Sequence, residues 1–355
     1  MRLTGLRITN FRNIGQAELD FQGARQFFCG SNGQGKTNLL EAIGMITAMR
    51  SFRTTKRLPL LRADEPHASI RANLELAGGK PIQVDIRLSR AVRKAFVDEA
   101  PVERFSDFIG NYPTVTLSSG DIQFLRGAPA LRRRFFDLIL SFGEPPYLEH
   151  LRKYHNTLKH RNALLKLDNP RPQLPAFDQL LAAQASAVTQ LRRDAIRHFH
   201  GYLVHFYNMI AQSGKEVPSI AYIPSKAAES PSDFLGLYQT NLGRDLHAGT
   251  TTIGPHRDDF SFELNGYPAE EYASEGQQRA LVLSLRFAQF AYFKEKSGTL
   301  PVLLADDILG ELDPIRRERF WQAIDEGTQL VATGTTLPDD PAPWQTFQVD
   351  NGTFS

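Results

Sequence analysis

The sequence predicts an α/β protein in which a phosphate-loop mixed sheet carries an antiparallel β lobe and an inserted α-helical lobe. Three observations predict this fold. A glycine-rich loop joins a short apolar strand to a helix, alternating apolar residues mark strands at 3–10, 16–21, 68–76 and 82–89, and the middle of the chain has helical spacing. We expect the phosphate-loop sheet and the β lobe to form one domain, the head, from residues 1–125 and 245–355. The inserted helical lobe is expected at residues 126–244.

The loop follows a predicted strand at 25–29 and leads into a helix from Asn38, which is the context that a phosphate-binding loop requires. Glycines let backbone N–H groups turn toward a phosphate, and the helix N-terminus adds partial positive charge there. The predicted nucleotide ligands in this loop are Gly30, Ser31, Asn32, Gly33, Gln34, Gly35, Lys36 and Thr37. Lys36 is expected to reach the β- and γ-phosphates, and the Thr37 hydroxyl to bind Mg²⁺.

An apolar strand at 301–305 ends in Asp306 and Asp307. Magnesium held by Thr37 needs a carboxylate from a neighbouring strand, so Asp306 is the predicted metal ligand. Asp307 is predicted to act with Lys36 in catalysis by polarising the water that attacks the γ-phosphate. The alternative is a strand that merely ends in acidic loop residues.

Ser274, Gly276 and Gln277 stand at the predicted start of a long helix that runs to about Lys296. A hydroxyl, a flexible backbone amide and the positive end of a helix form a second potential anion cradle. The same residues also fit a simple N-cap with Ser274 as the capping residue. The local sequence leaves both interpretations open.

Charge is distributed unevenly along the chain although the net charge is only +2. Residues 126–166 hold nine basic and three acidic residues, whereas the segment after Leu300 holds ten acidic and three basic ones. This separation favours a polyanion partner for one face, although solvated helix faces are the alternative for the basic segment. The predicted DNA-binding residues are Arg53, Lys56, Arg57, Arg132, Arg133 and Arg134.

The composition favours a cytoplasmic protein. No apolar run approaches the roughly 18 residues of a membrane span, and residues 1–7 lack a secretory h-region. The single cysteine, Cys29, allows no intramolecular disulfide and fits a reducing compartment.

Apolar residues in the middle of the chain recur at alternating steps of three and four, from Leu148 to Leu165 and from Leu181 to His205. The pattern predicts two helices that pack as an antiparallel hairpin across a turn at 170–175. His155, His198 and His205 fall on the predicted inner stripe, where packing is more common than metal binding. Strands are expected again at 250–253 and 259–264.

The order of motifs along the whole chain resembles the ATP-binding-cassette ATPases of DNA repair, which are relatives of the structural-maintenance-of-chromosomes ATPases, and within them the RecF family. The motifs that carry the resemblance are residues 8–13, the loop 30–37, residues 132–137, 154–162, 254–259 and 274–279, Asp306-Asp307, Glu311-Leu312-Asp313 and Thr333-Gly334-Thr335.

The resemblance implies an ATP- and Mg²⁺-dependent homodimer that clamps DNA. One protomer would supply Lys36, Thr37, Asp306 and Asp307, and the other would bring Ser274 and Gly276 to the γ-phosphate. Arg12 would contact the adenine or its phosphates, and Asp313 would lie at the same interface. Implied partners are duplex DNA, single-strand/double-strand junctions, and RecR- and RecO-like mediator proteins. The implied activity is a weak, DNA-stimulated ATPase. The implied role is to promote recombinase loading at gaps during DNA replication, DNA damage repair and the SOS response.

Two positions depart from the family pattern. Residues 118–121 read Ser-Ser-Gly-Asp, so Gln123 is only a candidate for the glutamine-loop residue, and Gly310 replaces the usual serine. Two other functions stay open. A scaffold that dimerises on ATP without hydrolysis fits the short carboxylate of Asp307, and a transporter ATPase shares the cassette but would need a switch histidine where Thr333–Thr335 stand.

Overall fold

The computed structural model describes residues 1–167, 172–211, 214–310, 312–338 and 343–355. The chain divides into two compact units. Unit 1 comprises residues 1–121, 206–212 and 282–355, and unit 2 comprises residues 122–205 and 213–281. The predicted division into a head and a helical lobe, with boundaries at residues 126 and 244, stays a prediction. The compact units group residues 245–281, which include Ser274, with the helical part.

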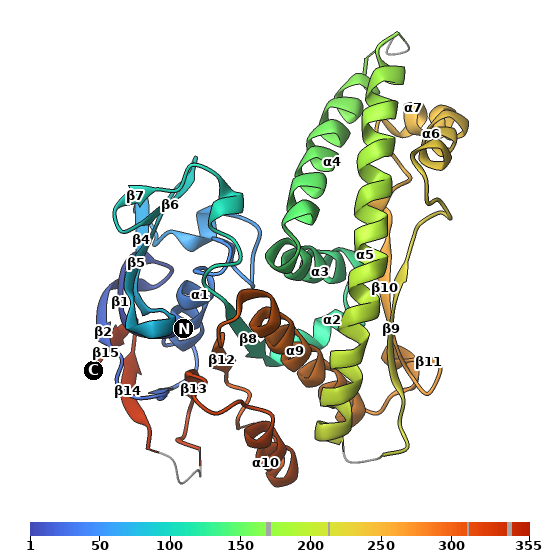
Figure 1. The fold of residues 1–355 in the computed structure, drawn as a ribbon. Coiled ribbons are helices and arrows are strands. Elements are labelled where there is room, and N and C mark those ends of the chain that lie inside the picture. The colour runs from blue at the N-terminus through green and yellow to red at the C-terminus, as the bar shows by residue number, and fades with distance from the viewer. Residues whose placement is uncertain (168–171, 212–213, 311, 339–342) are drawn as a thin grey trace. The chain divides into compact units, whose positions relative to one another are not determined.

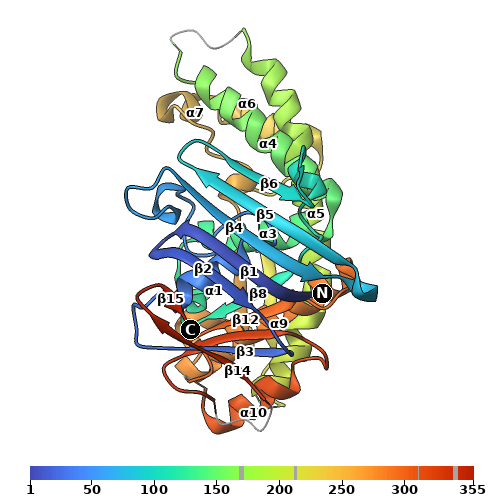
Figure 2. The same ribbon diagram turned by 90° about the vertical axis from the view of Figure 1, so that its left-hand side faces the viewer.

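Unit 1 contains two six-stranded sheets (Figures 1 and 2). The antiparallel sheet has the order β2-β1-β4-β5-β6-β7, and its strands are β1 (Arg2–Phe11), β2 (Ile14–Asp20), β4 (His67–Glu75), β5 (Pro81–Ser89), β6 (Arg93–Val97) and β7 (Ala100–Pro101). The second sheet has the order β15-β14-β3-β13-β12-β8, with strands β3 (Arg25–Cys29), β8 (Thr114–Ser118), β12 (Val302–Asp306), β13 (Leu330–Gly334), β14 (Gln345–Asp350) and β15 (Thr353–Phe354).

Five strands of the second sheet run parallel, and only β15 is antiparallel to its neighbour. Cys29 pairs with Gly334, and Asp306 pairs with Ser118. Because parallel strands end at the same edge, the segments that follow β3, β12 and β13 meet there. This register positions the site described below.

Helix α1 (Lys36–Gly44) packs between the two sheets and contacts β8, β12 and β13 on one side and β1 and β4 on the other. Leu39, Leu40 and Ile43 are completely buried in a core shared with Phe28 and Leu304. Each fully buried aliphatic or aromatic side chain stabilises the fold by about 1.5–3 kcal/mol. Unit 1 also contains α10 (Pro314–Gln322) and the part of α9 (Glu275–Ser297) that starts at residue 282.

Unit 2 is helical with one small sheet. Its helices are α2 (Gln123–Arg126), α3 (Pro129–Gly143), α4 (Pro145–Leu164), α5 (Leu174–Ala211) up to residue 205, α6 (Pro231–Thr240), α7 (Leu242–Ala248), α8 (Ala269–Tyr272) and the first turns of α9. The antiparallel sheet has the order β11-β10-β9, with β9 (Pro218–Ile223), β10 (Asp259–Leu264) and β11 (Tyr267–Pro268). In the described residues, no helix is both long enough and apolar enough to span a membrane.

Helices α4 and α5 pack antiparallel, because His150 contacts Gln184 and Arg161 contacts Asp178. The expected turn at 170–175 begins in residues outside the described ranges, and α5 already starts at Leu174. On α5, the second half of the predicted inner stripe, from Leu191 to His205, does not match the buried face of the helix. Heptad steps average 3.5 residues per turn whereas a straight helix has 3.6, so the stripe drifts by about 20° per heptad.

On α5 the drift accounts for the exposure of His198 and His205. His155, on α4, is also exposed, because the buried face of that helix lies one residue earlier than predicted. The buried positions are instead Tyr154 and Arg161 on α4, and Arg192 and Phe199 on α5.

The strand expected at 250–253 is also absent. Polar side chains hold the 250–253 segment in an irregular path. Asn162 Oδ1 accepts hydrogen bonds from the backbone N–H and the hydroxyl of Thr251, at 2.8 and 2.7 Å. Asp245 Oδ1 accepts in the same way from Thr252, at 2.9 and 2.7 Å. Side-chain hydrogen bonds to the local backbone compete with sheet ladders, and here they replace one.

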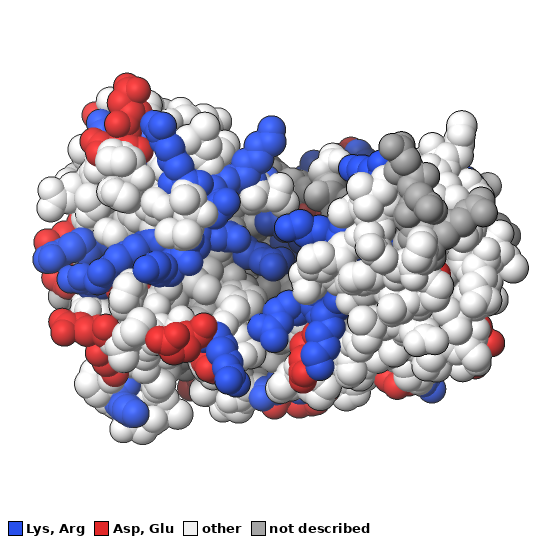
Figure 3. Space-filling view, turned by 90° about the horizontal axis from the view of Figure 1, so that it is seen from above, with Lys and Arg blue, Asp and Glu red and all other residues white. Residues whose placement is uncertain are grey.

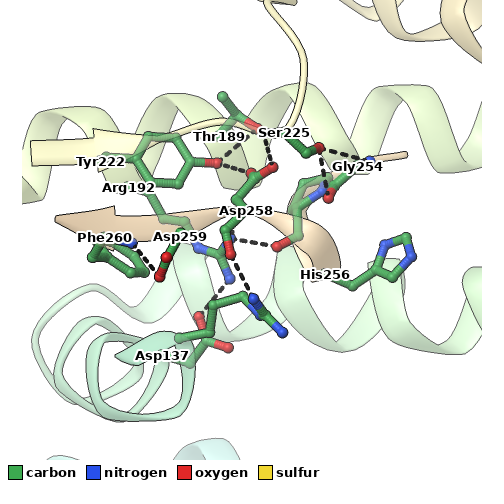
Figure 4. A network of polar contacts seen from close by, with 12 residues as sticks. Asp137, Thr189, Arg192, Tyr222, Ser225, Gly254, His256, Asp258, Asp259 and Phe260 are labelled. Carbon is green, nitrogen blue, oxygen red and sulfur yellow. Dashed lines mark hydrogen bonds and ion pairs between the residues drawn. The ribbon is translucent and has the colours of Figure 1, made fainter. Parts of the chain in front are cut away.

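Arg192 lies at the centre of a buried polar network in unit 2 (Figure 4). Its guanidinium donates to Asp137 Oδ1 at 2.7 Å, to the Pro255 carbonyl at 2.8 Å and to the Tyr147 hydroxyl at 3.0 Å. Asp258, also buried, accepts from the Ser225 N–H at 2.6 Å and from the Tyr222 hydroxyl. The network therefore ties α3, α5 and β9 to the loop before β10.

His256 joins α4 to the same loop. Burial lowers the pKa of His256 to about 4, so the ring is neutral. Tyr154 donates its hydroxyl hydrogen to His256 Nδ1 at 2.6 Å, and Nε2 donates to the Thr251 carbonyl at 2.9 Å. Gly254, with φ of 127°, leaves no room for a side chain, since a Cβ would lie 2.7 Å from the Tyr154 hydroxyl.

Replacement of Arg192 with methionine should lower the free energy of unfolding by about 3–5 kcal/mol, because Asp137 and Asp258 would lose a buried partner. Arg197→Met on the same helix is the matched control. Its ion pair with Asp194 is exposed, so its loss should cost less than about 1 kcal/mol. Urea unfolding of both variants measures the difference, and equal losses would contradict the importance of the network.

Candidate nucleotide site

The segments after β3, β12 and β13 form the candidate site at the edge of the parallel sheet in unit 1. Thr37 donates its hydroxyl hydrogen to Asp306 Oδ1 at 2.8 Å. Lys36, only 3% exposed, donates to the carbonyls of Gly30 at 2.8 Å and Ser31 at 3.2 Å, and its Nζ lies 3.8 Å from Asp307 Oδ1. The structure therefore brings the predicted loop and the predicted carboxylate pair together.

Thr333 on β13 fixes both carboxylate residues. Its hydroxyl accepts from the Asp307 N–H at 3.0 Å and lies 3.1 Å from Asp306 Oδ1. Asp307 has a left-handed backbone with φ of 55°, which non-glycine residues adopt only where the surroundings hold them. Sequence reasoning did not assign Thr333 this contact.

Burial, together with the charge of the neighbouring Asp307, raises the pKa of Asp306, while the Thr37 hydrogen bond opposes the shift. A nearby cation stabilises the ionised form of a carboxyl group, and this stabilisation is greatest where burial makes ionisation costly. A hydroxyl and a carboxylate oxygen are the hard ligands that Mg²⁺ prefers, and one or two protein ligands with water are usual for it. The residues present therefore fit a magnesium ion. Within the described ranges, no group of three or more His, Cys, Asp or Glu could hold a metal by itself.

Arg12 contacts the middle of α1. It donates from Nε and Nη2 to the carboxylate of Glu41, at 2.9 and 2.6 Å. Glu41 is fully buried and also accepts from Ser51 and, at 3.3 Å, from Arg53. Contact between Arg12 and a nucleotide stays a prediction, and it would require this guanidinium to share or leave Glu41.

Ser274 and Gln277 form a reciprocal cap at the start of α9, in unit 2. The Ser274 hydroxyl accepts from the Gln277 N–H at 3.3 Å, and Gln277 Oε1 accepts from the Ser274 N–H at 2.7 Å. This is a capping box, so the N-cap interpretation describes these residues as they stand. Gln277 Nε2 also donates to Glu216 at 2.6 Å. The predicted phosphate contacts of Ser274, Gly276 and Gln277 stay predictions.

The structure also describes two further predicted positions, Asp313 and Gln123, and the divergent segment 118–121. Asp313 accepts from the Arg316 N–H at 2.9 Å as the N-cap of α10, and Glu311 lies outside the described residues. Gln123 is exposed at the start of α2. Asp121, from the divergent 118–121 segment, is buried and forms a bidentate ion pair with Arg286, at 2.8 and 2.5 Å. Its role in unit 1 is therefore structural.

The triple arginine at 132–134 is mostly internal to unit 2. Arg132 is 9% exposed, pairs with Asp259 at 2.8 and 2.9 Å, and donates to the Gly127 carbonyl at 2.8 Å. Arg133 donates to the Asp258 carbonyl at 2.6 Å. These contacts give Arg132 and Arg133 partners inside unit 2, and their predicted contact with DNA stays a prediction. Arg134, partly buried, keeps its predicted role without support.

Other basic residues are on the surface, and Figure 3 shows Lys and Arg side chains gathered in a band on one face. The outer face of the antiparallel sheet carries Arg7, Arg71, Arg87 and Lys94 on four different strands. Arg87 and Lys94 are cross-strand neighbours at a shallow depression of about 350 Å³, lined also by Thr9, His67 and Ser69. Sequence reasoning missed this group, because strand register gathers residues that the sequence scatters.

The predicted residues 53–57 lie in the loop after α1. Arg53 is partly exposed and donates to Asn38 Oδ1 at 2.7 Å. Lys56 is exposed, and exposed Arg57 donates to the Ala91 carbonyl in the β5–β6 turn.

Thr333→Val keeps the side-chain shape but removes the hydroxyl that Asp306 and Asp307 share. We expect the free energy of unfolding to fall by about 1–3 kcal/mol, because buried partners lose a hydrogen bond. Nucleotide turnover should fall more than nucleotide affinity, since Asp307 loses its fixed backbone. Thr335→Val, at an exposed position two residues later, is the matched control. Equal behaviour of the two variants in unfolding and turnover assays would show that Thr333 does not position the carboxylates.

Comparisons with known proteins agree along the whole chain. Residues 2–336 match the family described as RecF/RecN/SMC N terminal domain. The chain is 37% identical over 343 residues to the DNA replication and repair protein RecF of Geobacter metallireducens, covering 95% of this chain and 93% of the relative. It is 34% identical over 364 residues to that of Shouchella clausii, covering 98% and 97%.

A solved structure described as the recombination mediator protein RecF-ATP in the RecFOR pathway superposes with a TM-score of 0.91 at 27% identity, covering 99% of this chain and 96% of that one. An Smc head domain from Pyrococcus furiosus, at 14% identity and a TM-score of 0.52, shares the fold alone. The ABC-type head predicted from the motifs is therefore confirmed. The chain belongs to the RecF family of DNA replication and repair proteins.

Proposed function

We propose that this chain is an ATP-dependent DNA-binding recombination mediator that hydrolyses ATP weakly and dimerises around bound nucleotide. The observation that carries the proposal is the hydrogen bond between Thr37 and Asp306, which joins a phosphate-binding loop to a magnesium-type carboxylate. The solved relatives that superpose on the chain are described as RecF-ATP and RecF-ATPrS complexes of the RecFOR pathway. Family membership disfavours the transporter alternative.

In this proposal the loop amides of residues 30–36 cradle the phosphates, and Lys36 leaves the Gly30 and Ser31 carbonyls to reach the β- and γ-phosphates. Thr37 and Asp306 hold Mg²⁺, which neutralises charge on the phosphate oxygens when bound. Asp307 orients the attacking water. The distance of 3.8 Å between Asp307 Oδ1 and Lys36 Nζ supports this role, because Lys36 is the proposed phosphate ligand.

A scaffold that binds ATP without turnover is the second candidate. The short side chain of Asp307 and its pairing with Lys36 favour slow water activation. ATPase assays with and without duplex DNA separate the two functions. The proposal includes recombinase loading at gaps with RecR- and RecO-like partners, and a cytoplasmic location. Its support is that the curated relatives are named DNA replication and repair protein RecF, and that a solved relative is described as a recombination mediator of the RecFOR pathway.

Dimer formation through the second anion cradle can be tested against its role as a helix cap. Ser274→Asp keeps an N-cap residue but places a negative charge where the γ-phosphate of a partner would bind. We expect this variant to bind ATP and remain monomeric, whereas Asp307→Asn should bind ATP and accumulate as a dimer. Sedimentation velocity with ATP measures both. If Ser274→Asp dimerises like the wild type, Ser274 is only a cap.

For DNA binding, we propose that Arg53, Lys56 and Arg57 act with the sheet residues Arg87 and Lys94. Lys94→Gln should weaken duplex binding similarly for all sequences, and should lower the slope of log affinity against log salt by about 1. Lys80→Gln is the matched control, because Lys80 is exposed in the β4–β5 turn, at the other end of β5. Fluorescence anisotropy at several salt concentrations measures both slopes. Identical slopes would remove the sheet face from the proposed DNA surface.

A further inference from the structure

The phosphate-binding loop is held from outside by two turns that come from opposite ends of the chain. One is the β1–β2 turn, which contains Asn13, and the other is the β14–β15 turn, which contains Asn351 and Gly352. Both turns converge on Gln34, in the middle of the loop. None of these three residues belongs to the phosphate-binding motif itself.

Asn13 contacts the loop and the helix that follows it. Its Nδ2 donates to the Gln34 carbonyl at 3.1 Å, and its Oδ1 accepts from Asn38 Nδ2 at 2.8 Å. The side chain also closes over Gly35, which has φ of 116° and where a Cβ would lie 2.8 Å from Asn13 Oδ1. Asn13 therefore fixes the last turn of the loop before Lys36.

The β14–β15 turn contacts the same residue, at both its carbonyl and its side chain. The Gly352 N–H donates to the Gln34 carbonyl at 2.7 Å, and the Asn351 N–H donates to Gln34 Oε1 at 2.7 Å. A Cβ on Gly352, whose φ is 79°, would lie 2.6 Å from the Asn13 carbonyl oxygen. The two turns therefore touch each other as well as the loop.

Strand β14 supports the first glycine of the loop. A side chain at Gly30 would collide with the Val349 carbonyl oxygen, so the backbone of β14 lies flush against the loop entrance. Support at the entrance by Val349, in the middle by Gly352 and at the end by Asn13 covers the loop from Gly30 to Gly35.

Such support matters because the loop contains three glycines, which have the greatest backbone freedom. A phosphate cradle works only when its N–H groups already point toward one centre, and ordering a free loop would reduce affinity. Two hydrogen bonds from outside the loop fix the orientation of the Gln34 carbonyl. The N–H of Gly35 belongs to the same planar trans peptide unit, so it points in the opposite direction.

We propose that Asn13 and the Asn351–Gly352 turn are positioning residues for nucleotide binding, so that the C-terminal hairpin β14–β15 forms part of the nucleotide site. The inference rests on the proposed binding of ATP. It also predicts that the two turns order the loop in the absence of nucleotide. The turns act through Gln34 and Gly35 rather than by contact with nucleotide.

Gly352→Ala and Gly78→Ala form a matched pair. Both glycines have φ near 80° and sit in β-hairpin turns of unit 1, but a Cβ at Gly78 meets no atom within 4 Å. The same backbone strain therefore arises at both positions, and only Gly352→Ala adds a collision with Asn13, which contacts the loop. We expect Gly352→Ala to weaken ATP binding about tenfold, and Gly78→Ala to change it less than about twofold.

Asn13→Ala and Asn73→Ala form a second pair. Asn73 is exposed on β4, where its Oδ1 accepts from Gln83. Asn13→Ala should weaken ATP binding about tenfold, and the double variant Asn13→Ala/Gly352→Ala should lose less than the product of the single losses, because both act through one residue. Asn13→Asp should behave like Asn13→Ala, since it cannot donate to the Gln34 carbonyl.

Hydrogen exchange without nucleotide provides a readout that does not depend on ATP. Peptides that cover residues 30–36 should exchange faster in Gly352→Ala and Asn13→Ala than in the wild type and both controls, at matched free energy of unfolding. Unchanged loop exchange in these variants would overturn the proposal. If the loop exchange responds but the wild-type protein does not bind ATP, the proposed function fails and the support of the loop stands. If the loop exchange responds and ATP affinity does not, the turns are structural only.

Discussion

The hydrogen bond from Thr37 to Asp306 joins residues 269 positions apart and depends on the register of one parallel sheet. Cys29 ends β3 opposite Gly334 of β13, and β12 lies next to β13, so three loops leave the sheet at a common edge. A shift of β12 by one residue would point Asp306 to the other face of the sheet. The buried packing of α1 against β12 and β13 secures the register, so the nucleotide chemistry depends on the core of unit 1.

Local patterns predicted the elements of this site well. The strand 25–29, the loop, the helix after it and the carboxylates after β12 all depend on short-range sequence, and each lies where its pattern indicates. Predictions that depend on contacts between residues far apart in the sequence were wrong. The heptad stripe on α5 drifted away from the true interface, and Thr250–Ile253 has strand-forming residues whose hydroxyls and amides bind Asn162 and Asp245 instead.

Arginine-rich segments illustrate the same limit. Charge counting treats Arg132 and Lys94 alike, but one is sealed against Asp259 and the other is exposed on a sheet. Several motif residues that carry the family resemblance belong to the buried polar networks of unit 2. They are Tyr154 and Arg161 from the motif at 154–162, and Pro255, His256 and Asp258 from the motif at 254–259. Resemblance identifies such residues as characteristic of the family, and only the contacts show that they hold unit 2 together. The turns that support Gln34 escape sequence reasoning for a related reason, since backbone N–H groups supply two of the three hydrogen bonds.

The cap at the start of α9 does not compete with a phosphate contact by Ser274. A hydroxyl has one hydrogen to donate and two acceptor sites, and the cap uses an acceptor site toward the Gln277 N–H. The hydrogen remains available to a phosphate oxygen, and the cap holds the side chain at the positive end of the helix. Gln277 differs, because its carbonyl accepts from Ser274 and its amide group donates to Glu216. A nucleotide contact by Gln277 would have to break the contact that orients Ser274. Of the two side chains, Ser274 is therefore the better placed for the proposed contact with the γ-phosphate held by a second protomer.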